Sequence, residues 1–205
     1  MKKIALCFLL GLFSGGAFAA GGGGDLIDAQ VDVSDTASLQ RGAKLFANNC
    51  MGCHSAEYMR WNALPEGLGV SMETIEETLI YGSYQQGDMM NVAMRGADAA
   101  DWFGAEPPDL SLTARSRGAD WVYTYLNSFY RDPDASIGWN NQLLANSSMP
   151  HVLWRLQGVP EPTYEEQGGE LLVAGIQVPE AQAGTLSEAE YHQATRDITN
   201  FMAFV

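Results

Sequence analysis

Cysteine, histidine and basic residues are all scarce in this chain of 205 residues. It has three cysteines, three histidines and 11 lysines and arginines, against 25 aspartates and glutamates. Its formal net charge is −14, and a surface this acidic argues against nucleic-acid binding, which needs cations opposite the phosphates. An acidic surface suits a basic protein partner instead, because opposite charges speed the encounter.

Long hydrophobic runs are absent too. The apolar run Ile4–Phe13 is too short to span a bilayer. Two lysines precede it, and a pattern of small residues ends at Ala19, which predicts a signal peptide over residues 1–19 and an exported protein. Cys7 lies inside the apolar run, where no lipidated cysteine would stand, so a lipoprotein signal is disfavoured.

Removal of the signal peptide leaves two cysteines, Cys50 and Cys53. A disulfide between them would close a very small loop and add little stability, so they are better explained by chemistry. The sequence Cys50-Met51-Gly52-Cys53-His54 is the attachment motif of c-type haem. Each thiol forms a thioether with one vinyl group, and the histidine becomes the proximal ligand of the iron. We therefore predict one covalent haem c at Cys50, Cys53 and His54.

Two other uses of a Cys-x-x-Cys motif fit less well. A structural zinc site needs four ligands, and the remaining histidines, His151 and His192, are not spaced as partners. A thioredoxin-like redox pair is expected near a strand–helix unit, whereas the residues before Cys50 have helical periodicity.

The second axial ligand decides the kind of cytochrome. A methionine makes an electron carrier, whereas an open position permits gas binding or catalysis. Met149 is the best candidate, because it lies in a non-helical segment far from His54 and Pro150 stiffens the backbone after it. Met51 is disfavoured because it lies inside the motif, and Met59 because it lies close to it. Met72 and His192 are disfavoured because they are expected on helices, Met72 in the core and His192 at the surface. The alternatives that stay open are His151, Met89, Met90 and Met94.

The pattern of elements predicts a mainly α fold with loops and short β-strands. A flexible acidic lead is expected over residues 20–37 and a single haem domain over 38–205. We expect helices from near Ser38 to Cys50, over 71–81, over 107–117 and from Asp120 to before 132, and an ordered loop over 137–150. A short strand pair is expected around 171–178, and the sequence Ser187–Glu190 is a capping box for a last helix.

Six segments together resemble the cytochrome c1 family, the haem subunit of the cytochrome bc1 complex (ubiquinol:cytochrome c oxidoreductase), in its bacterial form. The attachment motif alone indicates only a c-type cytochrome, and the Pro-Pro-Asp-Leu-Ser and Met-Pro segments are far more specific. The six are Leu39–Ala43, Cys53–Arg60, Trp102–Gly104, Pro107–Ser111, Asp120–Tyr123 and Met149–Trp154.

The resemblance implies a cytochrome c-like helical fold with insertions, built around one covalent haem. It implies that His54 and Met149 are the axial pair and that Arg95 pairs with a haem propionate. It also implies a pocket lined by Pro107, Pro108 and Trp121. Chemistry alone does not distinguish Arg95 from the other arginines near the haem segments, which are Arg115, Arg117 and Arg155.

The function implied is that of a single-electron carrier that is no enzyme on its own. The electron would come from the Rieske iron–sulfur protein, beside cytochrome b, and pass to a soluble or tethered cytochrome c. One rival is a subunit of an oxidase or nitric oxide reductase, which the Pro-Pro-Asp-Leu-Ser segment disfavours. Others are a haem sensor or enzyme with an open sixth position, and a non-haem extracellular domain with a disulfide.

Members of the resembled family continue into a C-terminal membrane helix. The apolar run Phe201–Val205 is far too short to span a bilayer, and no stop signal ends the last helix. We therefore expect the native chain to continue into an anchor that holds it at the periplasmic face of the inner membrane.

Overall fold

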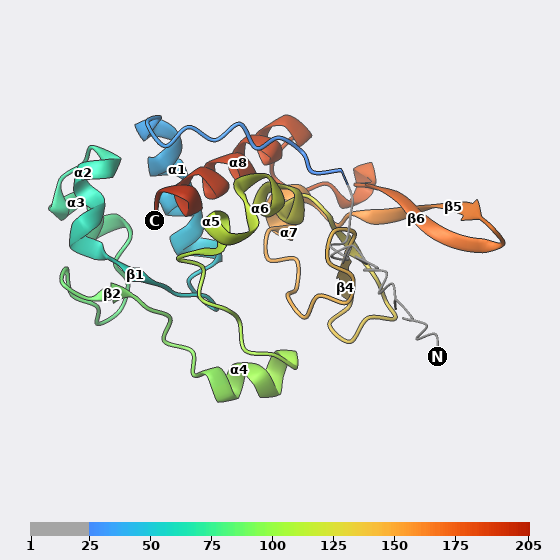
Figure 1. The fold of residues 1–205 in the computed structure, drawn as a ribbon, viewed down its shortest axis with the longest axis horizontal. Coiled ribbons are helices and arrows are strands. Elements are labelled where there is room, and N and C mark those ends of the chain that lie inside the picture. The colour runs from blue at the N-terminus through green and yellow to red at the C-terminus, as the bar shows by residue number, and fades with distance from the viewer. Residues whose placement is uncertain (1–24) are drawn as a thin grey trace, which may run out of the picture.

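A computed structural model describes residues 25–205, so the predicted signal peptide lies outside the described residues (Figure 1). Within residues 25–205, helices surround one core, and three short two-stranded sheets stand at its edges. The α-helices are α1 (Thr36–Asn49), α2 (Leu64–Leu68), α3 (Met72–Thr78), α4 (Gly96–Phe103), α5 (Thr113–Arg117), α6 (Ala119–Leu126), α7 (Trp154–Gln157) and α8 (Glu188–Phe204). The short 3-10 helices are η1 (Trp61–Ala63) and η2 (Glu180–Gln182). The antiparallel strand pairs are β1 (Ala56–Arg60) with β2 (Met89–Met90), β3 (Phe129–Arg131) with β4 (Trp139–Asn141), and β5 (Glu161–Gln167) with β6 (Glu170–Gln177).

The first and last helices, α1 and α8, pack against each other and form the centre of the fold (Figure 1). The Asp35 carboxylate caps α1 by accepting a hydrogen bond from the Ser38 amide at 3.0 Å, which starts the helix two residues before the predicted position. The predicted capping box of α8 is confirmed, since Ser187 and Glu190 accept hydrogen bonds from each other's backbone amides. Both helix ends are therefore specified locally.

A glycine allows the two helices to come close. A Cβ atom added to Gly42 on α1 would lie 2.0 Å from the Asp197 carbonyl oxygen on α8. Close to this contact, the rings of Phe46 and Phe201 are buried, with their centroids 5.4 Å apart. The absence of a side chain at Gly42 therefore sets the distance at which these aromatic rings can pack.

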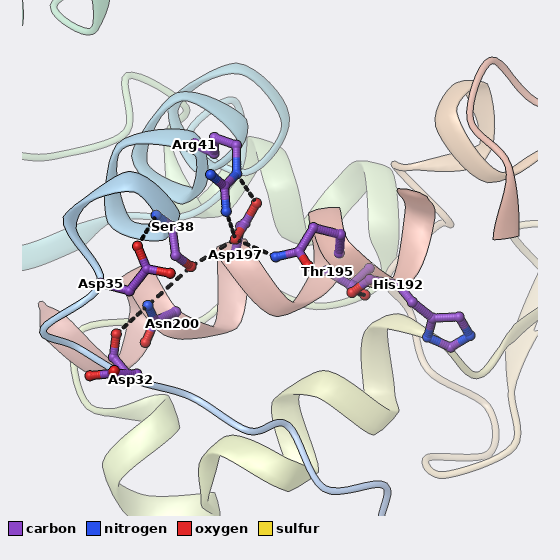
Figure 2. Close-up of polar contacts among 9 residues, drawn as sticks. Asp32, Asp35, Ser38, Arg41, His192, Thr195, Asp197 and Asn200 are labelled. Carbon is purple, nitrogen blue, oxygen red and sulfur yellow. Dashed lines mark hydrogen bonds and ion pairs between the residues drawn. The ribbon is translucent and has the colours of Figure 1, made fainter. Parts of the chain in front are cut away.

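A buried carboxylate joins the same two helices (Figure 2). The Asp197 side chain is 2% exposed and receives hydrogen bonds from Ser38 Oγ at 2.7 Å and from Gln193 Nε2 at 2.9 Å. The Arg41 guanidinium donates to both of its oxygens, at 2.6 and 2.9 Å. Asn200 Nδ2 extends the network by donating to Ser38 Oγ at 3.1 Å. The buried charge is thus paired and fully hydrogen-bonded.

We expect Asp197→Ala to destabilise the haem-loaded protein by about 3 kcal/mol, because it removes the acceptor on which this buried network depends. Urea unfolding followed by circular dichroism measures the change. The control is Asp98→Ala, which removes the partner of the exposed Arg95 in a surface ion pair and should cost less than about 0.5 kcal/mol. Equal losses in the two variants would contradict this account of the network.

Residues 25–35 differ from the flexible lead that the sequence predicts. This segment runs along α6 and α8 and buries Ala29 completely. The Ala29 amide donates to Asp120 Oδ1 at 2.8 Å, and its carbonyl accepts from Arg196 Nε at 2.8 Å. The prediction that Asp120 caps α6 is therefore wrong: the helix begins at Ala119, after Gly118, and the Asp120 carboxylate holds the lead instead.

Several element boundaries also differ from prediction. The helix predicted over 71–81 has the expected Ser71 cap but ends at Thr78. The segment 107–117 is helical only from Thr113, and α6 ends at Leu126, well before residue 132. The predicted loop 137–150 contains the short strand β4, and the strand pair begins at Glu161, ten residues earlier than expected. The helices α2, α4 and α7 and the first sheet have no counterpart among the predicted elements.

Candidate functional site

The attachment motif lies at the C-terminal end of α1, where the helix winds into a tight turn. The Cys50 amide still donates to Phe46 O at 2.8 Å, and the amides of Cys53 and His54 return to Cys50 O at 3.0 and 2.9 Å. This turn holds Cys50, Cys53 and His54 together at the end of the helix. Both cysteines are free thiols.

The two thiols have different surroundings. Cys50 is buried in the hydrophobic core, and burial, with a smaller contribution from Cys53, raises the pKa of its thiol to about 12. Cys53 is half-buried, and partial burial raises the pKa of its thiol as well. Thiol–disulfide exchange of the thioredoxin type depends on a thiolate with a lowered pKa, which is the opposite of this arrangement.

A backbone carbonyl orients the imidazole of His54. Nδ1 of His54 lies 2.7 Å from Pro108 O, and since a carbonyl can only accept, Nδ1 carries the proton and donates it. Nε2 is left with a free lone pair, the form in which histidine binds a metal. Burial lowers the pKa of His54, against the opposing influence of the Pro108 carbonyl and Asp109, so the ring is neutral at neutral pH.

The segment containing Pro108 is itself held to the chain that follows the motif. The Leu110 amide donates to Ser55 O at 2.8 Å, and the Asp109 carboxylate accepts from the Glu57 amide at 2.8 Å. Ser111 Oγ accepts from the Tyr58 amide at 3.1 Å. The Pro-Pro-Asp-Leu-Ser segment thus holds the ring of His54, a contact that residue types alone do not predict. The only local signal in this segment is an Asp-x-Ser turn, in which the Ser111 amide donates to Asp109 Oδ1 at 2.9 Å.

Met149 lies half-buried in the loop between β4 and α7. Its amide donates to Ser147 Oγ at 3.4 Å, and that hydroxyl lies 2.6 Å from the hydroxyl oxygen of Tyr125 on α6. The Tyr125 ring is stacked on Trp121, with centroids 5.0 Å apart. A chain of contacts therefore connects the predicted ligand Met149 with the predicted pocket residue Trp121.

The other candidate ligands have their own places in the fold. Met90 is buried in the core on β2, and His151 is 1% exposed among aromatic rings. His192 is half-buried rather than free on the surface, since Nδ1 lies 2.8 Å from the Tyr123 hydroxyl. Like Met149, five other methionines are half-buried: Met51, Met59, Met72, Met89 and Met94.

The arginines divide into exposed and packed side chains. The Arg95 side chain is 80% exposed and its guanidinium is paired with Asp98 at 2.6 Å. The Arg117 guanidinium lies 4.3 Å from the centre of the Trp121 ring. Of the two predicted pocket prolines, Pro107 is half-buried and Pro108 is exposed, with only the carbonyl of Pro108 committed to His54. Arg117 is thus in contact with a predicted pocket residue, whereas Arg95 is held by its own neighbour.

These side chains fit a covalently attached haem. Two free thiols stand at the required spacing, the histidine after them is neutral and has Nε2 free, and a half-buried methionine lies in a loop tied to aromatic residues. Cys50 belongs to the hydrophobic core, and Trp121 and Val152 pack against that core from α6 and the methionine loop.

Comparison with known proteins finds cytochromes c1 among the relatives of this chain. Residues 27–103 match the model of the Cytochrome C1 family. A cytochrome c1 from Allochromatium vinosum is 46% identical over 208 aligned residues, which include all of this chain and 84% of that protein. The ammonia monooxygenase gamma subunit of Nitrosomonas europaea is 40% identical and aligns with all of this chain over 82% of its own length. A mitochondrial cytochrome c1-1 from Solanum tuberosum is 30% identical over 73% of this chain and 51% of its own.

Proposed function

Because the chain belongs to the cytochrome c1 family, it is a haem c-carrying electron-transfer subunit of the cytochrome bc1 complex, and we propose which residues hold that haem and which partners it meets. It is an electron carrier and is not itself an enzyme. The observation that supports the site most strongly is the hydrogen bond from His54 Nδ1 to Pro108 O, which leaves Nε2 ready to bind iron.

In this proposal Cys50 and Cys53 form the two thioether bonds, His54 Nε2 is the proximal ligand and the Met149 sulfur is the distal ligand. When bound, the haem supplies a one-electron redox couple whose potential a methionine ligand raises. The protein's part is to hold both ligands still. Pro108 and Asp109 do this on the proximal side, and Ser147 and the Tyr125 hydroxyl restrain the methionine loop.

The proposed electron donor is the Rieske iron–sulfur protein, beside cytochrome b, and the proposed acceptor is a soluble or tethered cytochrome c. The net charge of −14 supports a basic acceptor, because opposite charges attract over about one Debye length, roughly 10 Å at moderate salt. Residues 25–205 contain no helix long and apolar enough to cross a membrane. We propose that the haem domain lies at the periplasmic face of the inner membrane, held there as part of the bc1 complex.

Stopped-flow mixing tests this function. The oxidised protein, matured in a periplasm with haem-attachment machinery, is mixed with the reduced soluble domain of a Rieske protein, and haem reduction is followed by visible absorption. We expect rapid reduction, and then oxidation by a basic cytochrome c at a rate that falls steeply with added salt. Failure of the Rieske domain to reduce the haem would contradict the proposed donor.

We expect Arg117 and Arg95 to differ in their effect on the haem propionates and on the midpoint potential. We expect Arg117→Gln to lower the midpoint potential by about 60 mV, because loss of a cation near the haem favours the ferric state; for one electron this shift corresponds to roughly 1.4 kcal/mol. We expect Arg95→Gln to change it by less than about a third of that, because the exposed Arg95 is already paired with Asp98. Spectroelectrochemical titration of both variants measures the difference. The opposite order would restore Arg95, the residue implied by the family resemblance.

A further inference from the structure

His151 follows Met149 by two residues and is enclosed by aromatic side chains. It is 1% exposed, and its ring is stacked on Phe129 with centroids 5.2 Å apart and planes 13° from parallel. The edges or faces of Trp139 and Tyr191 meet it nearly at right angles, at 5.2 and 6.4 Å. The His151 side chain, two residues after the predicted ligand, therefore has a fixed place in the core.

Two buried polar atoms, one in this ring and one on α7, have no hydrogen-bond partner among residues 25–205. They are Nε2 of His151 and Oε1 of Gln157, at the end of α7. The Gln157 side chain lies within interaction range of the His151 imidazole, and its acceptor atom is Oε1. A neutral imidazole with its proton on Nε2 is the complementary donor. Leaving both atoms unpaired is costly, and a small movement that joins them removes both costs.

The backbone of Gln157 is held from two sides, by Leu153 at the end of the methionine loop and by Gly184 before α8. Its amide donates to Leu153 O at 3.0 Å, and its carbonyl accepts from the Gly184 amide at 3.3 Å. Gln157 therefore offers an acceptor whose backbone is fixed. A hydrogen bond to it would resist movement of His151 and of the loop that carries His151.

One row of aromatic residues supports both ends of the methionine segment. On the N-terminal side, Ser147 is held by the Tyr125 hydroxyl, and on the C-terminal side His151 is stacked on Phe129. The rings of Tyr125 and Phe129 are themselves in contact, with centroids 4.9 Å apart. Met149 lies between these two supports, and Pro150 removes backbone freedom between the methionine and His151.

We propose that His151 is a positioning residue for the Met149 sulfur: its Nε2–H donates to Gln157 Oε1 when the methionine segment is seated, and this buried bond resists withdrawal of the ligand. The inference rests on the proposed ligation by Met149 and adds to it a specific restraint. Without the bond, the segment would still stack on Phe129 but would release the iron more often.

Competition by imidazole tests the restraint. Imidazole added to the ferric protein takes the sixth position only when the methionine has left, so its apparent affinity measures that release. His151→Phe keeps an aromatic ring for the stack and removes the donor, and Gln157→Leu removes the acceptor. We expect each variant to bind imidazole about tenfold more tightly than wild type, and to show a weaker sulfur-to-iron charge-transfer band, the change that loss of one buried hydrogen bond produces.

The double variant and a distant histidine supply the controls. His151→Phe with Gln157→Leu should also show about a tenfold effect rather than a hundredfold one, because both substitutions remove the same bond. His192→Phe makes the same chemical change at a hydrogen-bonded histidine on α8 and should leave imidazole affinity unchanged.

Unchanged imidazole affinity in either single variant, full additivity, or an equal effect of His192→Phe would overturn the proposal. If His151→Phe does not take up haem, Gln157→Leu carries the test alone. A wild-type protein without the charge-transfer band would instead refute Met149 ligation itself, so the two failures are distinguishable.

Discussion

Replacement of Met149 by leucine is expected to abolish the sulfur-to-iron charge-transfer band and to lower the midpoint potential by on the order of 0.2 V, within the roughly 0.8 V range that axial ligands cover. Leucine has nearly the same volume but offers no lone pair. The loop itself should persist, because its contacts with Tyr125 and Phe129 come from Ser147 and His151 rather than from the methionine side chain. Near-infrared absorption and a redox titration measure the two effects.

The matched controls are the same substitution at Met90, which is buried in the core, and at Met94, which is half-buried. Met90→Leu should lower stability by less than about 1.5 kcal/mol, as volume-conserving core substitutions do, and leave the potential nearly unchanged. If the band disappears in Met94→Leu and survives in Met149→Leu, the distal ligand comes from the segment before α4 instead.

Gly42→Ala adds one methyl group at the crossing of α1 and α8, and we expect this substitution to destabilise the protein strongly. In an ordinary helix the change would favour folding by about 1 kcal/mol, because alanine is the better helix former. Here the new Cβ would lie 2.0 Å from the Asp197 carbonyl oxygen and 2.9 Å from Phe201 Cβ. The atom that the new Cβ meets belongs to the backbone of α8, which cannot rotate away as a side chain can. The two helices must therefore separate, and we expect the free energy of unfolding to fall by about 3 kcal/mol or more.

Urea unfolding of the haem-loaded protein measures this cost, and Gly87→Ala is the control. A Cβ at Gly87 meets no atom within 4 Å, so that variant should unfold at the wild-type midpoint. Separation of the helices would also disturb the Phe46–Phe201 contact and the hydrogen bonds of Asp197. An unchanged midpoint for Gly42→Ala would show that the crossing is looser than described.

Local signals predicted the parts of the fold that local interactions determine. Ser71 and Ser187 cap their helices as expected, because a hydroxyl beside free amides acts within four residues. The attachment motif is likewise a pattern of five consecutive residues. Its thiols and imidazole come together through the turn at the end of α1, without help from distant segments.

Long-range contacts were beyond such signals. Asp120 has the residue type and place of a cap, yet its carboxylate binds the Ala29 amide, 91 residues away in the sequence. The support of His54 by Pro108 spans 54 residues and uses a backbone carbonyl, which has no signature in residue type. Whether Arg95 or Arg117 faces a propionate depends on tertiary packing in the same way, and only the structure shows Arg117 against Trp121.

Exposure of the dithionite-reduced wild-type protein to carbon monoxide tests the central claim most directly. If His54 and Met149 occupy both axial positions, the reduced haem has no free site, and its Soret spectrum should remain unchanged at neutral pH. Prompt formation of a carbon monoxide adduct would contradict the account, because it would show an open sixth position and a protein built for ligand binding or catalysis rather than for electron transfer.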